Sequence, residues 1–531
     1  MSQVFDVIVE KGTVVDGTGR PAFEADVGIV ADRILAIGDL RDAQSVERIG
    51  AVDHCVAPGF IDVHTHSDLA AFLPREHREL RLASLRQGVT TEICGNCGFS
   101  VFPTTTAHAD DVDRYLQVVL GSNARGFQTL AEYRAAVNEH APATNVGTLV
   151  GHGTLRAAVL GLERRPPTPE ESRQLENALD EACDEGAVGL SSGLIYAPGV
   201  YAQTGELTAL ARVAAKYGRP YVTHLRDEAD HVGDALEEAL RIGVDSGAAV
   251  QISHHKTSGR KNFGRTRDTI PLLERARESG LDVMIDVYPY TAGSTTLTAV
   301  LPPWVSEGGI DQLLKRLKDP LSRARLRRDL ARGLPGWQQL VGPGGWGDIV
   351  VATAPANPHY EGRAIDLLAG QRRCDELDFV CDLLLAEQGQ VTIILHLMAE
   401  EDVERVIASP LSIIGSDGIP LPGEPHPRWA GTFVRVLGEY VRKRSLLTLE
   451  EAVRKMTHAA AERFGLTGRG VLTEGAFADV VVFDPETVAD GATYEQPLTH
   501  PVGVSHVIVN GAISLRAGSP TDAHAGRFIR P

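Results

Sequence analysis

Residues 57–66 read Ala57-Pro58-Gly59-Phe60-Ile61-Asp62-Val63-His64-Thr65-His66. The apolar run in this stretch predicts a buried β-strand. Since residues two apart on a strand point to the same side, the side chains of His64 and His66 face one way. A His-x-His pair alone is compatible with ordinary packing. Here it lies where the strand passes into the polar Ser67-Asp68, and this context favours metal binding.

The same pattern, a short apolar segment that ends in polar residues and precedes a helical stretch, recurs along the middle of the chain. The candidate strands are Phe60–His66, Val89–Ile93, Val146–Gly151, Val188–Ser192, Tyr221–His224, Val250–His254, Val283–Tyr288 and Leu411–Ser416. Eight strands that alternate with helices predict an α/β fold of the (β/α)8 barrel type. An open doubly wound sheet is the alternative, but no G-x-G-x-x-G motif and no Walker P-loop supports a nucleotide site.

Two of the helices carry clear start signals. Thr168-Pro169-Glu170-Glu171 is a capping box with proline in the first turn, and it predicts a helix that runs to about Cys183. Thr448-Leu449-Glu450-Glu451 opens a second helix, which we expect to end near Gly465.

Both ends of the chain are rich in β-branched residues and turn signals, including Asn510-Gly511, a typical hairpin turn. Each end alone has few strands and little to bury. We therefore predict one small β domain composed of residues 1–57 and 471–531, with the barrel in residues 58–470.

A long stretch at about 295–370 interrupts the barrel pattern. It contains three of the four tryptophans, Trp304, Trp337 and Trp346, and a basic, helical segment over Leu314–Arg332. We interpret it as an inserted subdomain with its own small core. A lid over the barrel mouth is the other interpretation, and the two are compatible because barrel insertions often fall at the active-site face.

The composition excludes several classes of protein. The 531 residues carry a formal charge of −18, which argues against nucleic acid or an anionic membrane as the main partner. No apolar run approaches the ~20 residues of a membrane span, and the first residues lack the features of a signal peptide. Six cysteines are too few for a disulfide framework. We expect a cytoplasmic protein, and a homo-oligomer is compatible with the sequence.

Cys94 and Cys97 form a C-x-x-C pair at the end of the second candidate strand. A redox pair is one interpretation, but the residues that follow do not resemble a helix start. A structural zinc site would need a second such pair nearby. We favour a single thiolate in a mixed His/Cys metal site, with Cys97 as the ligand because glycines flank it, and with Glu92 as a substitute ligand on the same strand.

Further candidate ligands lie at the ends of other strands. Each alone is more often structural, but together the six come from strands one, two, five, six and eight: His64, His66, Cys97, His224, His254 and Asp417. In a closed barrel, strands one and eight are neighbours, as are strands five and six. A mixed set of nitrogen, sulfur and oxygen donors suits Zn²⁺, and six ligands are enough for two metals, or for one metal plus catalytic groups.

These motifs together resemble the amidohydrolase superfamily and, within it, the N-acyl-D-amino-acid deacylases (D-aminoacylases). The similarity runs nearly end to end. Its motifs are Pro58–His66, Gly95–Gly98, Val150–Arg156, Thr223–Glu228, Ile252–Lys256, Asp286–Tyr290, Gly415–Gly418 and Pro425–Arg428. The resemblance implies a barrel with a β domain built from both termini.

The resemblance also implies roles for individual residues. One tightly bound zinc ion would lie on Cys97, His224 and His254, and a second, weaker site on His64 and His66, with Asp417 near both. The substrate carboxylate would bind Lys256, Tyr288, Ser294 and Arg428, which match the residues that the family uses for this purpose. The fourth candidate strand has no lysine to bridge two metals, which supports a site of the cysteine type.

The expected reaction is zinc-dependent hydrolysis of an N-acyl-D-amino acid to a D-amino acid and a carboxylate. Zinc can lower the pKa of bound water to ~7, and Asp417 would take the proton of the water and pass it to the leaving nitrogen. The handedness of the substrate depends on the resemblance alone. The alternatives are a cyclic-amide hydrolase of the hydantoinase or dihydroorotase type and a non-catalytic scaffold, which would have lost ligands.

Overall fold

The computed structural model describes residues 4–342 and 345–531. In this part of the chain, each of the predicted barrel segments contains a strand. The strands are β6 (Phe60–Asp62), β7 (Val89–Cys94), β8 (Asn145–Thr148) with its continuation β9 (Val150–Gly151), β10 (Leu190–Gly193), β11 (Tyr221–His224), β12 (Val250–Ile252), β13 (Val283–Val287) and β18 (Ser412–Ile414).

All of these strands pair in parallel, in the order β6-β7-β8 and β9-β10-β11-β12-β13-β18. Hydrogen bonds beyond the strand ends connect β18 back to β6: Asp417 N donates to His64 O over 2.7 Å, and His66 N to Gly418 O over 2.9 Å. The sheet is therefore closed. The predicted (β/α)8 barrel is confirmed, and the open doubly wound sheet is excluded.

Helices follow the strands on the outside of the barrel. They are α1 (Arg78–Arg86), α2 (Ala109–Leu120), α3 (Leu130–His140), α4 (His152–Leu160), α5 (Pro169–Glu185), α6 (Thr204–Lys216), α7 (Val232–Ser246), α8 (Thr266–Glu278), α13 (Glu400–Ala408), α14 (Arg428–Arg435), α15 (Leu449–Met456) and α16 (His458–Arg463). The capping box predicted at Thr168 is present at the start of α5.

The helix predicted from Thr448 to about Gly465 is divided into α15 and α16. The break lies at Thr457, whose φ and ψ are −137° and −88°. The Thr457 hydroxyl donates to Val453 O over 2.6 Å, which offers this carbonyl an alternative to the helical backbone bond.

The two ends of the chain form one nine-stranded sheet, in the order β22-β21-β20-β19-β5-β1-β2-β3 with β4 on β1. Its strands are β1 (Val4–Val14), β2 (Phe23–Val30), β3 (Arg33–Gly38), β4 (Gln44–Gly50), β5 (Cys55–Pro58), β19 (Val480–Phe483), β20 (Val504–Val509), β21 (Ala512–Arg516) and β22 (Ser519–Pro520). Strand β19 pairs with β5, so the two ends are joined inside the sheet. Asn510 and Gly511, both with positive φ, form the predicted hairpin turn.

The insertion between β13 and β18 has its own antiparallel sheet, in the order β14-β17-β15-β16. Its elements are β14 (Gly293–Thr296), α9 (Ile310–Lys318), α10 (Pro320–Arg332), β15 (Ile349–Thr353), β16 (Arg363–Ala364), α11 (Ile365–Arg372), α12 (Glu376–Ala386) and β17 (Thr392–Leu395). It also has a separate apolar core. The sheet extends past the predicted span of about 295–370, because the central strand β17 is supplied by residues 392–395.

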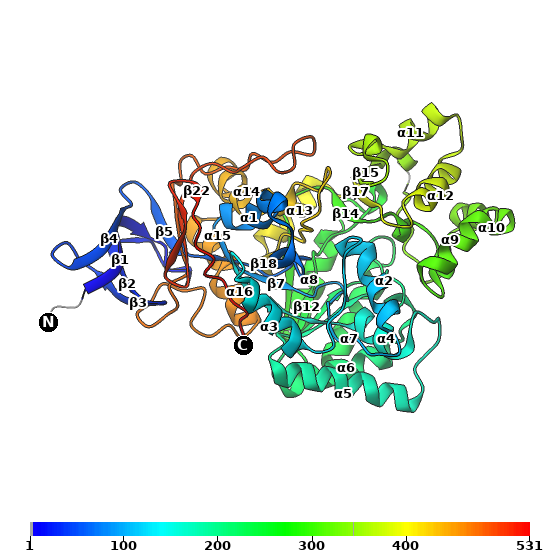
Figure 1. The fold of residues 1–531 in the computed structure, drawn as a ribbon, viewed down its shortest axis with the longest axis horizontal. Coiled ribbons are helices and arrows are strands. Elements are labelled where there is room, and N and C mark those ends of the chain that lie inside the picture. Colours follow the sequence, from blue (N-terminus) through cyan, green and yellow to red (C-terminus); the bar gives the residue numbers. More distant parts are fainter. Residues whose placement is uncertain (1–3, 343–344) are drawn as a thin grey trace.

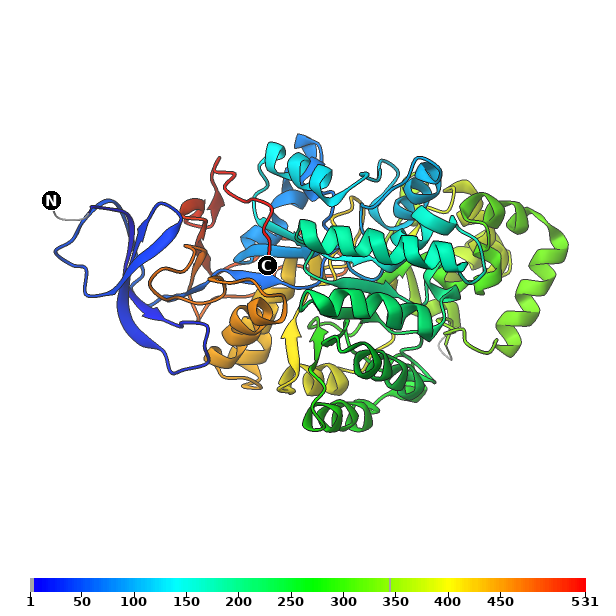
Figure 2. The same ribbon diagram turned by 90° about the horizontal axis from the view of Figure 1, so that it is seen from below.

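The small β domain and the insertion lie at opposite ends of the barrel (Figures 1 and 2). The β domain meets the amino ends of barrel strands: Gly59 N, just before β6, donates to Asp479 O over 2.9 Å. The insertion covers part of the opposite mouth, since Leu340 and His254 line one pocket. None of the helices in the described part of the chain has the length and hydrophobicity that a membrane span requires.

Candidate metal centre and active site

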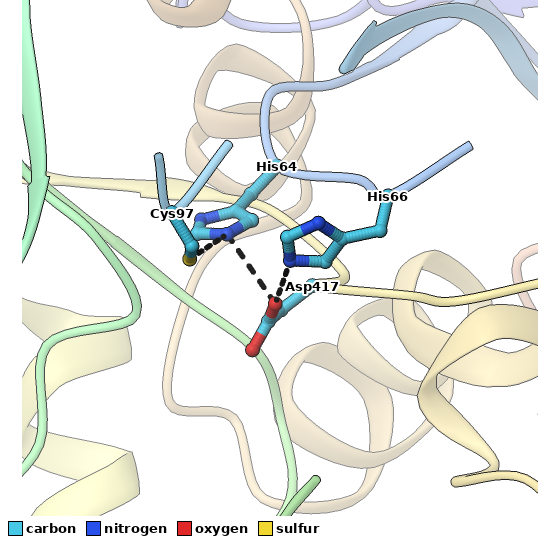
Figure 3. Close-up of side chains that lie close together, drawn as sticks. All are labelled: His64, His66, Cys97 and Asp417. Carbon is cyan, nitrogen blue, oxygen red and sulfur yellow. Dashed lines mark hydrogen bonds and ion pairs between the residues drawn. The ribbon is translucent and has the colours of Figure 1, made fainter. Parts of the chain in front are cut away.

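The six predicted ligand residues gather in two groups at the carboxyl ends of the barrel strands. The first group is His64, His66, Cys97 and Asp417, and the second is Cys97, His224 and His254. Within each group the donor atoms lie within 4.8 Å of one another, and all six side chains are buried. Figure 3 shows the side chains of the first group pointing toward one another, with dashed lines from the Asp417 carboxylate to both imidazoles. Cys97 belongs to both groups and thus lies between two candidate metal positions.

The distances and the donor types fit a metal such as zinc. Cys97 Sγ lies 3.3 Å from His64 Nε2 and 3.5 Å from His254 Nε2. Asp417 Oδ1 lies 3.3 Å from Nε2 of both His64 and His66. Both ring nitrogens of the buried His224 lack a hydrogen-bond partner. Buried polar atoms are rarely left unpaired, so His224 is a side chain that a metal ion would satisfy.

The backbone is strained at three of the six ligands. Cys97, His254 and Asp417 have φ values of 52°, 36° and 52°, in the left-handed region that residues other than glycine seldom adopt. Such strain is concentrated at functional sites, where the surrounding structure holds it in place. Next to Cys97, a Cβ atom at Gly98 would lie 2.9 Å from Gly193 N. Glycine therefore allows the Cys97 loop to approach the end of β10, as the flanking glycines predict.

The charges in the site support a thiolate and a carboxylate. Burial raises the pKa of the Cys97 thiol, but the charge of His64, together with the hydrogen bond and the charge of His254, outweighs it, and the pKa lies well below its usual range. Burial also opposes ionisation of Asp417, but Arg428 and His64 hold its pKa well below the ordinary value. Burial lowers the pKa of His66, whereas hydrogen bonds to Asp417 and Cys97 raise it, to about 9 overall. The site thus keeps two anions, whose countercharge comes from imidazolium groups or from a bound cation.

Two carboxylates for which the sequence pattern indicated no role orient the histidines. His64 Nδ1 donates to Asp286 Oδ1 over 3.0 Å, and His254 Nδ1 lies 2.9 Å from Glu228 Oε1. These contacts direct the Nε2 atoms of both rings at Cys97, which is the arrangement that fixes metal-binding histidines. Both acids belong to motifs at strand ends, Asp286 in β13 and Glu228 four residues after His224.

The four predicted substrate-binding residues lie beside the metal ligands. A pocket is lined by Lys256, Tyr288 and Ser294 together with His224, His254 and Asp417. Arg428, the first residue of α14, is buried, and its Nη1 lies 2.8 Å from Asp417 Oδ2. The Arg428 guanidinium also lies over the Tyr288 ring, 4.7 Å from its centroid.

Cys94 and Glu92 lie outside both groups. Cys94 is buried, and its thiol contacts Gly147 O and the Tyr133 hydroxyl, at 3.4 and 3.7 Å. Glu92 accepts hydrogen bonds from Ser84 and Thr144. Both cysteines of the C-x-x-C motif are free thiols, and only Cys97 faces the candidate metal positions.

Comparison with known proteins shows to which family this chain belongs. A model described as the amidohydrolase family matches residues 49–514. The D-aminoacylase of Alcaligenes xylosoxydans xylosoxydans is 40% identical over 528 residues, which cover 99% of this chain and 98% of that protein. A solved structure of D-aminoacylase, from work on the role of its binuclear metal centre, has a TM-score of 0.83 and 38% identity and covers 99% of this chain and 100% of its own.

A second solved structure is N-acyl-D-glutamate deacylase from Bordetella bronchiseptica, complexed with zinc and a phosphonate inhibitor that mimics the tetrahedral intermediate of the reaction. It has a TM-score of 0.85 and 36% identity, and the match covers 100% of both chains. Since the family model and these relatives span almost the whole sequence, this chain belongs to the amidohydrolase family.

Proposed function

We propose that this protein is a zinc-dependent hydrolase that converts N-acyl-D-amino acids to D-amino acids and carboxylates. The observation that carries the proposal is the pair of ligand groups that share Cys97, next to a pocket that contains Lys256. The relatives support the substrate class, since they are named D-aminoacylase and N-acyl-D-glutamate deacylase. Strand β10 has no lysine that could bridge two metals, and Cys97, which belongs to both ligand groups, would take that place.

The ligand residues would hold the metal in the way that the resemblance implies. Cys97, His224 and His254 would form the tight site, and His64, His66 and Asp417 the weaker one. When bound, zinc supplies a water of lowered pKa and polarises the substrate carbonyl. The remaining chemistry belongs to the side chains of this protein.

Asp417 would act as the general base and then as the general acid. Its carboxylate is ionised because Arg428 and His64 lower its pKa, so it can accept the proton of the attacking water. The same carboxyl group can then donate this proton to the departing nitrogen. Asp417 Oδ1 lies 3.3 Å from Nε2 of both His64 and His66, so this oxygen lies beside two of the side chains that would hold the metal.

Lys256, Tyr288, Ser294 and Arg428 would bind the substrate carboxylate. Lys256 and Arg428 are cations close to the Tyr288 ring, 5.6 and 4.7 Å from its centroid. In a protein of charge −18, two buried cations beside one aromatic ring would suit an anionic group of the substrate. The cytoplasmic location and a homo-oligomeric state stay predictions.

The test is an assay of the zinc-loaded enzyme with a panel of N-acetyl-D- and N-acetyl-L-amino acids. We expect release of the free amino acid from the D-series, and Asp417→Asn to lower kcat by at least about 100-fold. Asp110→Asn, at an exposed position of α2, serves as the control and should keep full activity. If the wild type released no amine, the substrate class would be wrong. Near-full activity of Asp417→Asn would exclude its role in proton transfer.

A further inference from the structure

His426, in the Pro425–Arg428 motif, belongs neither to the two ligand groups nor to the residues that line the pocket beside them. Its side chain is buried, with 4% of its surface exposed. Both ring nitrogens contact backbone groups: Nε2 lies 2.9 Å from Ala292 O, and Arg428 N donates to Nδ1 over 3.1 Å. His426 thus joins two segments that each carry a candidate for binding the substrate carboxylate, Ser294 and Arg428.

The two partners determine where the proton of the His426 ring lies. A carbonyl oxygen only accepts a hydrogen bond, so Nε2 carries the proton; a backbone N–H only donates, so Nδ1 carries none. The ring is therefore a neutral imidazole in one tautomer. Burial and the charge of Arg428 agree with this, since they lower the pKa of His426 well below its ordinary value.

The contact at Nδ1 fixes the start of helix α14. Arg428 is the first residue of this helix, and the first N–H groups of a helix have no partner within it. Pro427, which precedes the helix, provides no side-chain cap, so His426 supplies the missing acceptor. This hydrogen bond fixes the backbone from which the Arg428 side chain extends.

The contact at Nε2 fixes the segment that the Arg428 side chain meets. Ala292 lies two residues before Ser294, and Arg428 Nη2 donates to Ser294 O over 3.3 Å. The backbone of one segment and the guanidinium of the other are thus joined at both ends by hydrogen bonds. Among the described residues, the buried Nε of Arg428 has no hydrogen-bond partner. Because buried donors are rarely left unpaired, this N–H is available to an anionic ligand.

Three tyrosines enclose the His426 ring. Tyr288 and Tyr290, which follow β13, have ring centroids 6.3 and 5.2 Å from that of His426. Tyr494, in the segment between β19 and β20, has its ring centroid 5.2 Å away. The rings of Tyr290 and Tyr494 stand nearly perpendicular to the imidazole, at 90° and 80°. The barrel and the small β domain therefore hold this ring together.

We propose that His426 is a positioning residue that holds the Arg428 guanidinium beside Ser294, where this cation meets the carboxylate of the N-acyl-D-amino acid. The inference rests on the proposed function and adds a residue that acts through Arg428 rather than on the substrate. Without the acceptor at Nδ1, the first turn of α14 is free to shift, and the guanidinium shifts with it. A misplacement of about 1 Å in a substrate-positioning group can cost about 100-fold in rate.

Three substitutions separate the two hydrogen bonds of His426. The carbonyl oxygen of Asn takes about the place of Nδ1, the amide nitrogen of Gln takes about that of Nε2, and Phe keeps a ring without either group. The substrate is the N-acetyl-D-amino acid that the zinc-loaded wild type cleaves fastest. We expect His426→Phe and His426→Gln to raise KM at least about tenfold, with a smaller effect on kcat, and His426→Asn to stay within about threefold of the wild type. Zinc per chain should be unchanged in all three, because the six ligand residues are intact.

A double-mutant cycle tests whether the effect passes through Arg428. Arg428→Lys keeps the cation but removes the planar guanidinium. In this background, His426→Phe should lower kcat/KM less than about threefold, against at least about tenfold in the wild-type background. The control is His396→Phe, the same change at an exposed histidine whose ring also lies 5.2 Å from that of Tyr494. It should alter neither KM nor zinc content.

Equal losses in both backgrounds would indicate a general structural role and overturn the inference. Loss of zinc in parallel with activity, or a KM of His426→Phe close to the wild-type value, would also overturn it. If His426→Phe does not fold, the comparison of His426→Gln with His426→Asn decides, and equal KM values in these two variants would contradict the assignment. If the wild type released no amine from any N-acetyl-D-amino acid, the proposed function itself would be refuted.

Discussion

At the scale of single residues, two cysteines of one C-x-x-C motif differ in their surroundings. Cys97 has a left-handed backbone and a thiol directed at His64 and His254, whereas the Cys94 thiol faces Gly147 O and Tyr133. We therefore expect Cys97→Ser to lose tightly bound zinc and to lower kcat/KM at least about 100-fold, because a metal ligand is removed. Zinc per chain by elemental analysis after dialysis, together with the assay, checks this.

Cys94→Ser is the matched control, because it makes the same substitution three residues away. It should retain zinc and activity, and its cost should appear only as a stability loss of about 1 kcal/mol. Loss of activity in Cys94→Ser with zinc retained would instead support the redox interpretation of the motif.

The sequence predicted ligands better than the residues that orient them. A ligand at the end of an apolar strand leaves a local pattern, as in the strand that begins at Phe60, so all six could be named. The role of Glu228 depends on the 2.9 Å distance between its Oε1 atom and Nδ1 of His254, which follows a different strand. No local sequence pattern predicts such a distance. The same reason kept the Arg428–Asp417 contact out of the prediction.

At the scale of elements, a buried ion pair joins two barrel helices. Glu206 of α6 accepts hydrogen bonds from His152 and Arg156 of α4, at 2.8 Å and at 2.6 and 2.8 Å. Burial raises the pKa of Glu206, but its hydrogen bond with His152 and the charges of His152 and Arg156 outweigh it and lower the pKa to about 2. The folded state therefore binds this proton less readily than the unfolded state does.

The sign of the pH effect follows from that difference. The stabilisation by Glu206 is complete above the ordinary pKa of 4.5 and is lost as the pH falls toward about 2. A shift of this size corresponds to about 3 kcal/mol. We expect Glu206→Gln to be less stable than the wild type at pH 7, and the gap between their urea midpoints to narrow below pH 4.5.

Loss of metal at low pH affects the wild type and Glu206→Gln alike. The difference between their urea midpoints at each pH therefore does not include this effect. Glu163→Gln, at an exposed ion pair with Arg165, is the control and should follow the wild type throughout. If the difference between the two urea midpoints stayed constant from pH 7 to pH 3, protonation of Glu206 would not affect stability.

The insertion marks the limit of what local patterns predict about elements. Its tryptophans and basic helical segment predicted a separate core, which the structure has. Its far boundary was not predicted, because residues 392–395 belong to the insertion only through pairing of β17 with β14, almost 100 residues earlier in the chain, and with β15. The basic segment is two helices, because Asp319 and Pro320 begin a new one.

At the scale of the whole molecule, the last residues of the described chain return to the barrel and pair with strand β8. Val146 N donates to Arg527 O over 3.0 Å, and Ile529 N donates to Val146 O over 2.8 Å, so this segment runs along β8. Phe528 packs in one apolar core beside Tyr133, and Ile529 packs in another. The composite domain was predictable from the β-rich ends of the chain. The return of the last residues to the barrel was not, because it depends on two hydrogen bonds between residues that lie far apart in the sequence.

These contacts predict that the segment stabilises the fold without taking part in catalysis. Phe528→Ala combined with Ile529→Ala removes two buried side chains, each worth at least about 2 kcal/mol including the cavity that remains. We therefore expect the free energy of unfolding to fall by about 4 kcal/mol or more, measured by urea denaturation. The kcat at 15 °C should change less than about twofold, because the segment pairs with the amino end of β8, whereas the ligand residues lie at the carboxyl ends of the strands.

Arg530→Ala, at an exposed neighbouring position, should change neither the free energy of unfolding nor kcat. A large loss of kcat at unchanged stability would mean that this segment communicates with the metal site, a coupling for which the packing of Phe528 and Ile529 gives no route.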